Sequence, residues 1–291
     1  MANSILTFKK YTDLLDEVYK TASVTSVLDM NAALVRMGVN ASEIVIPKIS
    51  MDGLGDYSRN SGYAQGSVTL THETVPFNYD RGRRFTVDAM DDEESAGVAF
   101  GSLSGEFIRT KVAPEEDAFR FAQYAGKTGI SKVAAGASLA DGAAVIAALR
   151  AAITKMDEDE VPANERYLYI TPLLLGYVQD MDTTKSREVM QNFAKVVKVP
   201  QSRFYTAIEQ KSGKTGEEAG GYAKAEGGKD INFMILHKPA LIQFSKHIAP
   251  KIIEPGANQD GDAYKFGYRQ VAIADVYKNK VAGIYLHHKA T

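Results

Sequence analysis

The spacing of hydrophobic positions along the chain changes near residue 43 and again near residue 88. Between these points apolar and polar residues alternate, as in Ser67-Val68-Thr69-Leu70, and a Gly-rich polar stretch lies at 51–66. Alternation with a period of two is typical of strands, and a Gly-rich stretch between two such runs is typical of a turn. The pattern predicts one long hairpin over residues 43–88, polar on both faces and too small to hold a core of its own.

A helical period follows the predicted hairpin. Carboxylates cluster at 88–94, where the positive end of a helix dipole would stabilise them, and an apolar stripe with helical spacing runs through 100–108. Pro114 interrupts the stripe, which then resumes. A proline inside a helix removes one hydrogen bond and clashes with the preceding turn. We therefore expect a long helix over about 89–125, bent or broken near Val112-Ala113.

The rest of the chain mixes both periods. Compact apolar runs at 166–170 and 231–236 predict strands, and Pro172 and Pro239 after them predict helix starts. Further strand patterns follow Lys251. The sequence as a whole predicts an α+β fold with long extended appendages.

Composition excludes several classes of protein. The 291 residues include 34 Lys and Arg and 36 Asp and Glu, which gives a net charge of −2. Such a chain does not bind nucleic acid through its overall charge. It has no Cys, so disulfides and Cys-ligated zinc are excluded. No apolar run approaches the roughly 20 residues of a membrane span, and no secretory signal is evident, so we expect no membrane partner and a start in the cytoplasm.

Motifs of known catalytic sites are incomplete in this chain. Two Gly-Lys-Thr triplets, at 126–128 and 213–215, lack the earlier Gly of a phosphate-binding loop. The stretch 101–105 resembles a nucleophile elbow, but its central residue is Leu103 instead of Ser. The five histidines have no metal-ligand spacing. We therefore predict no catalytic residue, no metal site and no cofactor, and we expect that the protein is not an enzyme.

One charged segment is a candidate for contacts between subunits. Its arginines could meet a phosphate backbone, but without a basic surplus or aromatic residues around them we favour ion pairs with a neighbouring element or subunit. Its carboxylates could form an acid–base or metal site, yet carboxylates that face water at a helix start are the simpler interpretation. The candidate residues are Arg81, Arg83, Arg84, Asp88, Asp91, Asp92 and Glu94.

Six stretches of the chain, together with the order of the predicted elements, carry a resemblance to a known family. The stretches are Ile46-Pro47-Lys48-Ile49, Gly53-Leu54-Gly55-Asp56-Tyr57, Asp80-Arg81-Gly82-Arg83, Val87-Asp88-Ala89-Met90-Asp91, Glu106-Phe107-Ile108-Arg109-Thr110-Lys111-Val112-Ala113-Pro114 and Ala118-Phe119-Arg120-Phe121. These stretches belong to the structural framework and carry no chemistry. They resemble the major capsid protein of tailed bacteriophages, which has the Hong Kong 97-type fold. The local similarity is strongest to capsid proteins of phages that infect Firmicutes, and it extends over about residues 20–285.

The resemblance implies a division of the chain into named parts. These are an N-terminal arm at 1–42, an extended loop at 43–88, a peripheral domain with a spine helix at 89–136 and 236–291, and an axial domain at 137–235. Some relatives crosslink a Lys to an Asn between subunits with the help of a Glu. The extended loop here offers only Lys48, so this chemistry is not expected.

The resemblance also implies a function and partners. The protein would be a structural component of the virion that assembles with itself, as hexamers and pentamers, into an icosahedral shell around double-stranded DNA. Assembly would take place in the bacterial cytoplasm, with a separate scaffolding protein and a portal, and the shell would contact DNA non-specifically. Two other functions remain open. One is an encapsulin-like shell that holds a cargo enzyme, and the other is a small-molecule enzyme with a polar pocket lined, for example, by Asp180, Asp182 and His237.

Overall fold

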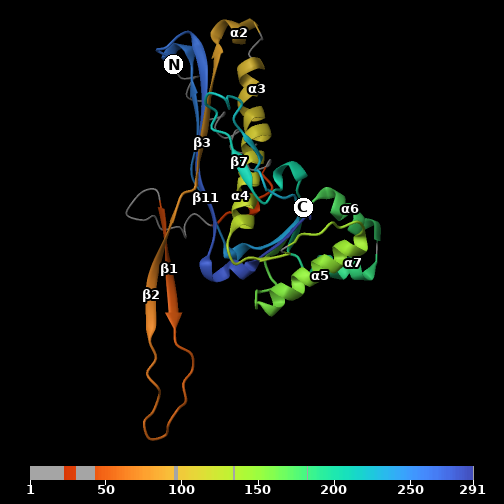
Figure 1. The fold of residues 1–291 in the computed structure, drawn as a ribbon. Helices are drawn as coiled ribbons and strands as arrows, with labels where there is room; N and C mark the ends of the chain where they lie inside the picture. The colour runs from red at the N-terminus through yellow and green to blue at the C-terminus, as the bar shows by residue number, and fades with distance from the viewer. Residues whose placement is uncertain (1–22, 31–42, 95–97, 134, 182, 291) are drawn as a thin grey trace.

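The structure is a computed structural model that describes residues 23–30, 43–94, 98–133, 135–181 and 183–290. Figure 1 shows an elongated molecule with three parts. A narrow sheet and a long helix extend in one direction, a two-stranded hairpin extends in the opposite direction, and a broader sheet with its helices lies to one side between them. The α+β class predicted from the sequence is confirmed.

The hairpin consists of β1 (Glu43–Met51) and β2 (Val68–Pro76), which pair antiparallel from Glu43 opposite Pro76 to Met51 opposite Val68. It ends at residue 76 and not at 88. The next strand, β3 (Tyr79–Asp88), pairs with β11 (Ala263–Val276), and β11 pairs on its other side with β10 (Leu241–Ile253). The alternating pattern is the same in β2 and β3, so the sequence could not reveal that β3 has a distant partner.

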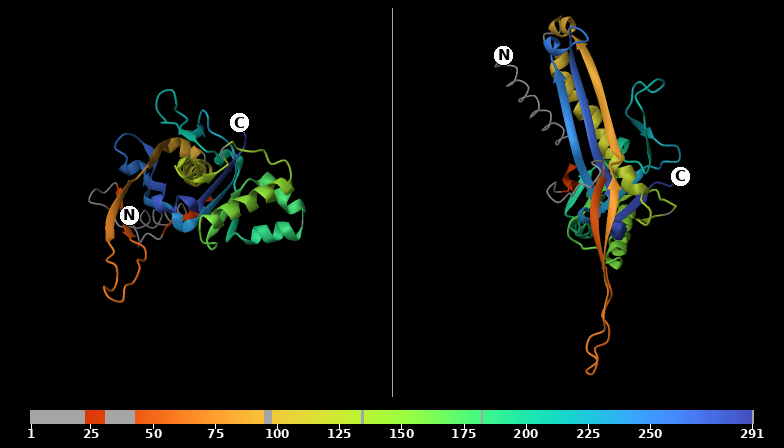
Figure 2. Two further views of the ribbon diagram at one scale, coloured as in Figure 1. Left: turned by 60° about the horizontal axis from the view of Figure 1, so that its bottom comes forward. Right: turned by 90° about the vertical axis from the view of Figure 1, so that its left-hand side faces the viewer.

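Asn78 lies in the two-residue link between β2 and β3 and fastens it to the narrow sheet. Its side-chain nitrogen donates to the backbone oxygen of Ala274 at 2.9 Å, and its side-chain oxygen accepts from the backbone N–H of Ala274 at 3.1 Å. The side-chain amide of Asn78 thus makes the same pair of hydrogen bonds to β11 that the backbone of a neighbouring strand would make. Hairpin and narrow sheet are thereby joined end to end (Figure 2, right).

The predicted long helix is present with one irregularity. It comprises α3 (Val98–Phe107), a π-helical segment (Ile108–Val112) and α4 (Ala113–Gly126). The predicted start at 89 forms a separate short helix, α2 (Ala89–Glu94), which lies across the end of α3 in Figure 1, and residues 95–97 lie outside the described residues. Pro114 occupies the first turn of α4. A π turn is wider than an α turn, so it makes room for the proline ring, which would otherwise clash with the carbonyl four residues earlier. The predicted irregularity near Val112 is therefore confirmed as a π segment, in which the helix continues.

The broader sheet has five strands in the order β4-β12-β9-β5-β6. They are β4 (Ser131–Lys132), β12 (Ile284–His288), β9 (Ile231–His237), β5 (Arg166–Ile170) and β6 (Lys195–Lys198). Every residue of β9 is buried, because hydrophobic clusters cover both of its faces.

Helices cover one face of this sheet, and the long helix lies on the other. The helices α5 (Gly142–Glu158), α6 (Pro172–Met181) and α7 (Thr184–Gln191) pack on the first face (Figure 2, left). On the other face Phe121 and Tyr124 of α4 join the core. A small hairpin of β7 (Ile208–Gln210) and β8 (Tyr222–Lys224) lies beside α4.

The helix predicted to start at Pro239 is absent. Lys238–Ala240 form a single 3₁₀ turn, and the chain then continues as the 13-residue strand β10. A proline near the start suits a 3₁₀ turn as well as an α-helix, and the residues that follow decide between them. Leu241, Ile242 and Gln243 are all buried, which fits a strand covered on both faces.

Candidate assembly surfaces

The described ranges hold no candidate metal site. Within them no three His, Asp or Glu side chains come close enough to hold a metal ion. In this part of the chain no helix combines the length and apolar character that a membrane crossing requires. Of the residues suggested for an enzyme pocket, Asp182 lies outside the described residues, Asp180 is exposed, and His237 is buried in β9.

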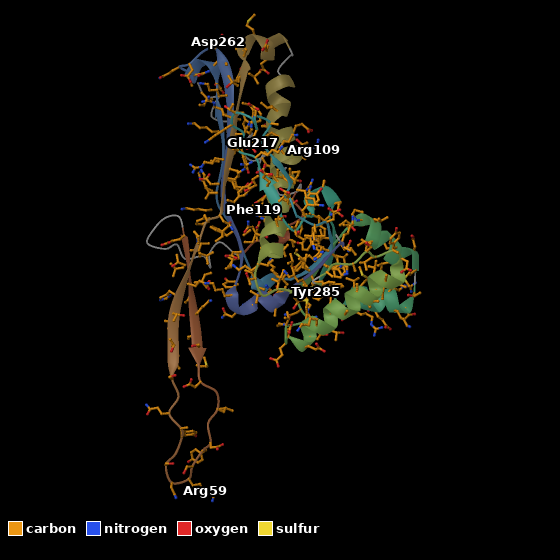
Figure 3. All side chains as sticks on the ribbon, viewed as in Figure 1. Arg59, Arg109, Phe119, Glu217, Asp262 and Tyr285 are labelled. Carbon is orange, nitrogen blue, oxygen red and sulfur yellow. The ribbon has the colours of Figure 1, made fainter. Side chains whose placement is uncertain are left out.

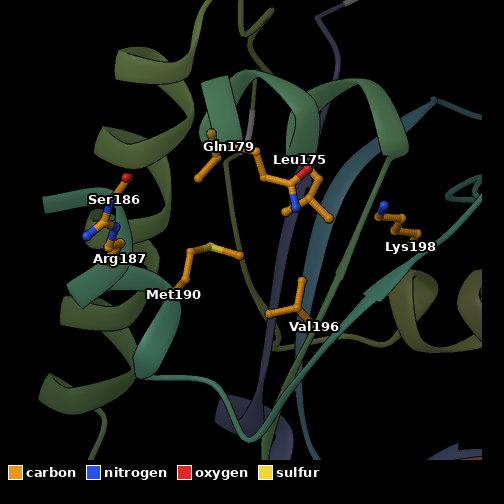
Figure 4. Close-up of a pocket in the computed structure, with 8 residues that line it drawn as sticks. Leu175, Gln179, Ser186, Arg187, Met190, Val196 and Lys198 are labelled. Carbon is orange, nitrogen blue, oxygen red and sulfur yellow. The ribbon is translucent and has the colours of Figure 1, made fainter. Parts of the chain in front are cut away.

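A groove of about 520 Å³ lies between α6, α7 and β6 (Figure 4). Leu175, Val178, Met190 and Val196 supply its apolar lining, and none of the eight residues that line it is Asp, Glu or His. A second cavity, of about 410 Å³, lies beside α4 and contains neither Asp180 nor His237. The second cavity is lined in part by Lys127 and Asp275, which pair with each other. Neither cavity contains the residues suggested for an enzyme pocket.

The base of the hairpin packs against its own subunit. Ile44, Ile46 and Val75 are buried against Ile242 of β10 and Ile273 of β11. All three hairpin residues point to the same face, because Ile44 lies directly opposite Val75 and Ile46 follows two residues later. Burial of these apolar side chains fixes the hairpin where it leaves the body.

An ion pair reinforces this attachment. Glu73 of β2 lies on the same face as Ile46, and its carboxylate contacts the ammonium groups of Lys48 across the hairpin and, at 2.7 Å, of Lys278 in the body. Burial favours the neutral acid, but the two lysines outweigh it and lower the pKa of Glu73. The Lys48 side chain is therefore already engaged within its own chain.

The distal half of the hairpin is exposed and has two unlike faces. Ile49 lies opposite Leu70, and Met51 lies opposite Val68, so these four side chains form one strip, which we call the apolar strip. They are 59–69% exposed. The other face of the same half carries Lys48, Ser50, Thr69 and Thr71. Figure 3 shows Arg59 at the tip of this hairpin, far from the densely packed body.

A short N-terminal segment, residues 23–30, is bound to the body through Asp117 of α4. This carboxylate is fully buried and accepts five hydrogen bonds. Two come from the hydroxyls of Ser23 and Thr25, at 2.8 and 2.7 Å, and two come from backbone N–H groups at 3.1 Å. The fifth comes from the guanidinium of Arg203 at 3.1 Å. One side chain thus joins three separate parts of the chain.

Arg120 and Gln243 complete this binding site. Arg120 donates to the Thr25 hydroxyl at 2.8 Å and pairs with Glu116 at 2.5 Å. The Gln243 side chain donates to the Thr25 carbonyl at 2.8 Å and to Asp29 at 2.7 Å. Burial raises the pKa of Glu116 despite the opposing charge of Arg120. Segment 23–30 is therefore held by α4 and β10 together.

Two of the arginines predicted to contact another subunit bond within their own chain. Arg81 donates to Glu115 at 2.7 Å and to the backbone oxygen of Gly221 at 3.2 Å. Arg83 donates to the backbone oxygen of Glu218 at 2.6 Å. Arg81 thus ties β3 to α4 and to the loop between β7 and β8, and Arg83 ties β3 to the same loop.

The other members of that charged segment lie at the distal end of the narrow sheet. Arg84 and Asp88 of β3 and Asp91 of α2 are exposed, Asp92 is half-buried, and Glu94 ends α2. In the described part of the chain, Asp88 and Asp91 form no ion pair with Arg81 or Arg83. Contacts of this segment with another subunit stay a prediction.

Sequence reasoning missed Asp117 and Glu73. Asp117 follows Glu115 and Glu116, so it resembled one more carboxylate of a helix start. The sequence feature that distinguishes Asp117 from the carboxylates before it is its position directly before Ala118 and Phe119, which face the core. Glu73 sits in an alternating strand next to His72 and Thr74, and nothing local distinguishes it from a solvated residue.

No family model and no curated protein matches this chain by sequence. Solved structures match it closely in shape. The virus-like particle of Pyrococcus furiosus matches with a TM-score of 0.61 and 12% identity over 97% of this chain and 99% of that one. The capsid of Staphylococcus phage Andhra matches with a TM-score of 0.58 and 10% identity over 93% and 85% of the two chains.

The capsid of cyanophage P-SCSP1u matches with a TM-score of 0.56 and 13% identity, covering 88% of this chain and 86% of that chain. Identity to the Staphylococcus phage is no higher than to the cyanophage, so the expected closeness to phages of Firmicutes is not supported. These matches cover 88–97% of this chain. The protein therefore has the Hong Kong 97-type capsid fold that its sequence resembles.

Proposed function

We propose that this protein is the major capsid protein of a tailed phage, and that many copies assemble into a closed icosahedral shell around double-stranded DNA. The observation that carries the proposal is that the capsid fold extends over almost the whole chain. A projecting hairpin, whose distal half its own body does not cover, supports it. An isolated two-stranded hairpin is marginal in water, so this one gains from a second surface.

In this proposal the parts of the chain take the roles named in the sequence analysis. The long helix and the narrow sheet form a peripheral domain, and the five-stranded sheet with α5, α6 and α7 forms an axial domain. Copies group as hexamers and pentamers, with a separate scaffolding protein and a portal as further partners. A chain with a net charge of −2 suits a shell that surrounds DNA without binding it through overall charge. The protein then resides in the virion.

A second shell function is an encapsulin-like compartment. The observation in its favour is the match to the virus-like particle of Pyrococcus furiosus, which covers 99% of that chain. The two functions share the fold and differ in their contents, which are DNA in one case and a protein cargo in the other.

Electron microscopy of the purified protein tests the proposal. We expect closed particles of uniform size over a range of protein and salt concentrations, with or without a co-expressed scaffolding protein. A protein that stays monomeric under every condition would contradict it. Particles from the natural host distinguish the two shells, since DNA protected from nuclease indicates a capsid and a packaged enzyme indicates a compartment.

A further inference from the structure

Strand β6 forms one edge of the five-stranded sheet. It pairs with β5 along its whole length, and within the described ranges no strand pairs with its other side. The amide of Ala194, just before β6, donates to the backbone oxygen of Arg166 in β5 at 2.8 Å. Successive amides of a strand point to alternate sides, so those of Lys195 and Val197 point to the outer edge. One more strand can pair with them there.

The groove between α6, α7 and β6, which we call the edge groove, opens beside this strand. Val196 and Lys198 line it, whereas Val197 packs on the core at the other face of the sheet. Leu175 is buried and Met190 is half-buried in the lining, and Figure 4 shows both side chains around the same opening as Val196. A strand added to β6 would therefore place alternate side chains in the edge groove.

The charge of the edge groove restricts what can occupy it. Arg187 and Lys198 lie on opposite sides of it, and none of the described residues that line it is acidic. Residues 184–198, which contain α7 and β6, include four Lys and Arg and one Glu, and the exposed Asp180 of α6 does not line the groove. Lysines on an edge strand repel a basic strand and attract an acidic one. The complementary occupant is therefore apolar in the middle and acidic on both sides.

We propose that β6 and the edge groove together bind an extended segment of another protein, in which one aliphatic residue has a carboxylate two positions away on each side. The backbone of the segment pairs with the outer edge of β6. Its aliphatic side chain contacts Met190 and Val196, and its carboxylates meet Lys198 and Arg187. Binding requires only the folded subunit, so the inference goes beyond the proposed function and does not depend on it.

Three fluorescein-labelled peptides serve as probes. The first, Thr-Glu-Thr-Leu-Thr-Glu-Thr, has both carboxylates on the same face of the strand as the leucine. The second has lysine in place of each glutamate. The third, Glu-Thr-Thr-Leu-Thr-Thr-Glu, has the composition of the first but carries its carboxylates on the opposite face. We expect fluorescence anisotropy with the full chain, at about 0.15 M salt, to show at least tenfold tighter binding of the first peptide than of the other two.

Two lysines of β6 provide a matched pair of variants. Lys198→Glu reverses a charge in the edge groove, and Lys195→Glu makes the same change on the opposite face, and both positions are exposed. The two positions lie about 10 Å apart along the strand, which exceeds the screening length of about 8 Å at this salt concentration. We expect Lys198→Glu to weaken binding of the first peptide at least fivefold and Lys195→Glu to stay within twofold. Both should keep the wild-type circular dichroism spectrum.

Two further measurements test the apolar contact and the strand pairing separately. Met190→Gln keeps the length of the side chain but removes its apolar character, so it should weaken binding at least threefold, and Met190→Leu should bind as the wild type does. When the first peptide is bound, hydrogen exchange should slow at the amides of Lys195 and Val197 more than at that of Val196, which points to β5.

Four results would overturn the inference. These are failure of the first peptide to bind more tightly than the other two, equal effects of Lys198→Glu and Lys195→Glu, equal effects of Met190→Gln and Met190→Leu, and unchanged exchange at Val197. Peptide binding that disappears as a rising subunit concentration drives self-association would identify a second copy as the occupant, and would overturn it too. Each result leaves the proposed function standing, which requires only that the wild type forms shells.

Discussion

Asp117 and His287 are the single residues whose burial has the clearest energetic consequences. Both are polar and almost completely buried, so each depends on its hydrogen-bond partners. Asp117 needs its negative charge to receive five donors. His287 needs to be neutral, because its Nδ1 atom lies 3.0 Å from the Asn232 side-chain nitrogen, which donates to it in that state.

Replacement of Asp117 by Asn should destabilise the subunit by about 2–4 kcal/mol. An amide accepts fewer of the five hydrogen bonds and leaves Arg203 without its charged partner, and bonds to a charged group are worth ~1.5–3 kcal/mol each. Urea denaturation measures the loss, and hydrogen exchange should show faster exchange at the Val24 and Thr25 amides. Asp56→Asn at the exposed tip is the control, and equal stability of the two variants would contradict the role of Asp117.

The subunit should lose stability as the pH falls from about 6.5 to about 4. Burial, with a smaller contribution from His288, lowers the pKa of His287 to about 4, whereas in the unfolded chain it lies near 6.5. A depressed folded-state pKa means that the stabilisation is complete above pH 6.5 and is lost as the pH falls through this window, by up to about 3 kcal/mol. Unfolding curves measured from pH 7 to pH 4 test this.

A variant isolates the contribution of this histidine. His287→Gln can still accept a hydrogen bond from Asn232 but does not titrate, so its stability should vary less between pH 6.5 and pH 4 than that of the wild type. His72→Gln, at an exposed position of the hairpin, should keep the wild-type profile. Identical profiles for His287→Gln and the wild type would exclude this residue as the cause.

At the scale of elements, the local sequence pattern predicted those features that depend only on residues close together in the chain. The long helix, its irregularity before Pro114, and the helix start at Pro172 all follow from spacing and from proline chemistry, and the structure contains them. Pairing between distant segments was not predictable. Strand β3 looked like part of the hairpin because its partner lies about 190 residues further along the chain.

The candidate assembly surfaces, which are the hairpin and the charged segment, were also only partly predictable from the sequence. The sequence marked the hairpin as an element that needs a second surface, which the structure supports. It described both faces as polar, which was wrong for the distal half, because the register that aligns Ile49 with Leu70 depends on strand pairing. The arginines at 81 and 83 were expected to pair with a neighbouring element or subunit, and in the structure they bond to Glu115 and to the loop near Glu218 of their own chain. Contacts of this segment with another subunit stay a prediction.

The joint between the hairpin and the narrow sheet should depend on Asn78. Asn78→Ala removes the two bonds to Ala274, and because water can replace part of them we expect a loss of about 1 kcal/mol. Hydrogen exchange should accelerate at the Ala274 amide more than at that of Ala272. Asn60→Ala, at the hairpin tip, should change neither quantity, and an unchanged rate at Ala274 would show that Asn78 does not hold the joint.

At the scale of the whole molecule, the charged segment divides into two groups with different expected effects. Arg81 bonds to Glu115 within the subunit, so charge reversal there places two carboxylates together. Arg84 is exposed on the same strand. The two positions therefore separate folding from assembly.

Arg84→Glu should leave the unfolding free energy within about 0.5 kcal/mol of the wild type, as is usual for exposed positions. If this segment contacts a neighbour, shell yield should fall, because the same repulsion recurs at every interface. Arg81→Glu should lower stability itself. Size-exclusion chromatography with circular dichroism measures both effects, and wild-type shell yield for Arg84→Glu would remove Arg84 from the predicted contacts.

The direct continuation of β2 into β3 determines how the subunit responds to a pulling force. Tension applied along the hairpin reaches β3 lengthwise through residues 77–78, and β3 is bonded to β11 from Tyr79 to Asp88. Interstrand hydrogen bonds run perpendicular to the strands, so a lengthwise pull loads the whole ladder in shear and does not unzip it bond by bond. A pull transmitted through the hairpin would therefore act in the direction in which the narrow sheet is mechanically strongest.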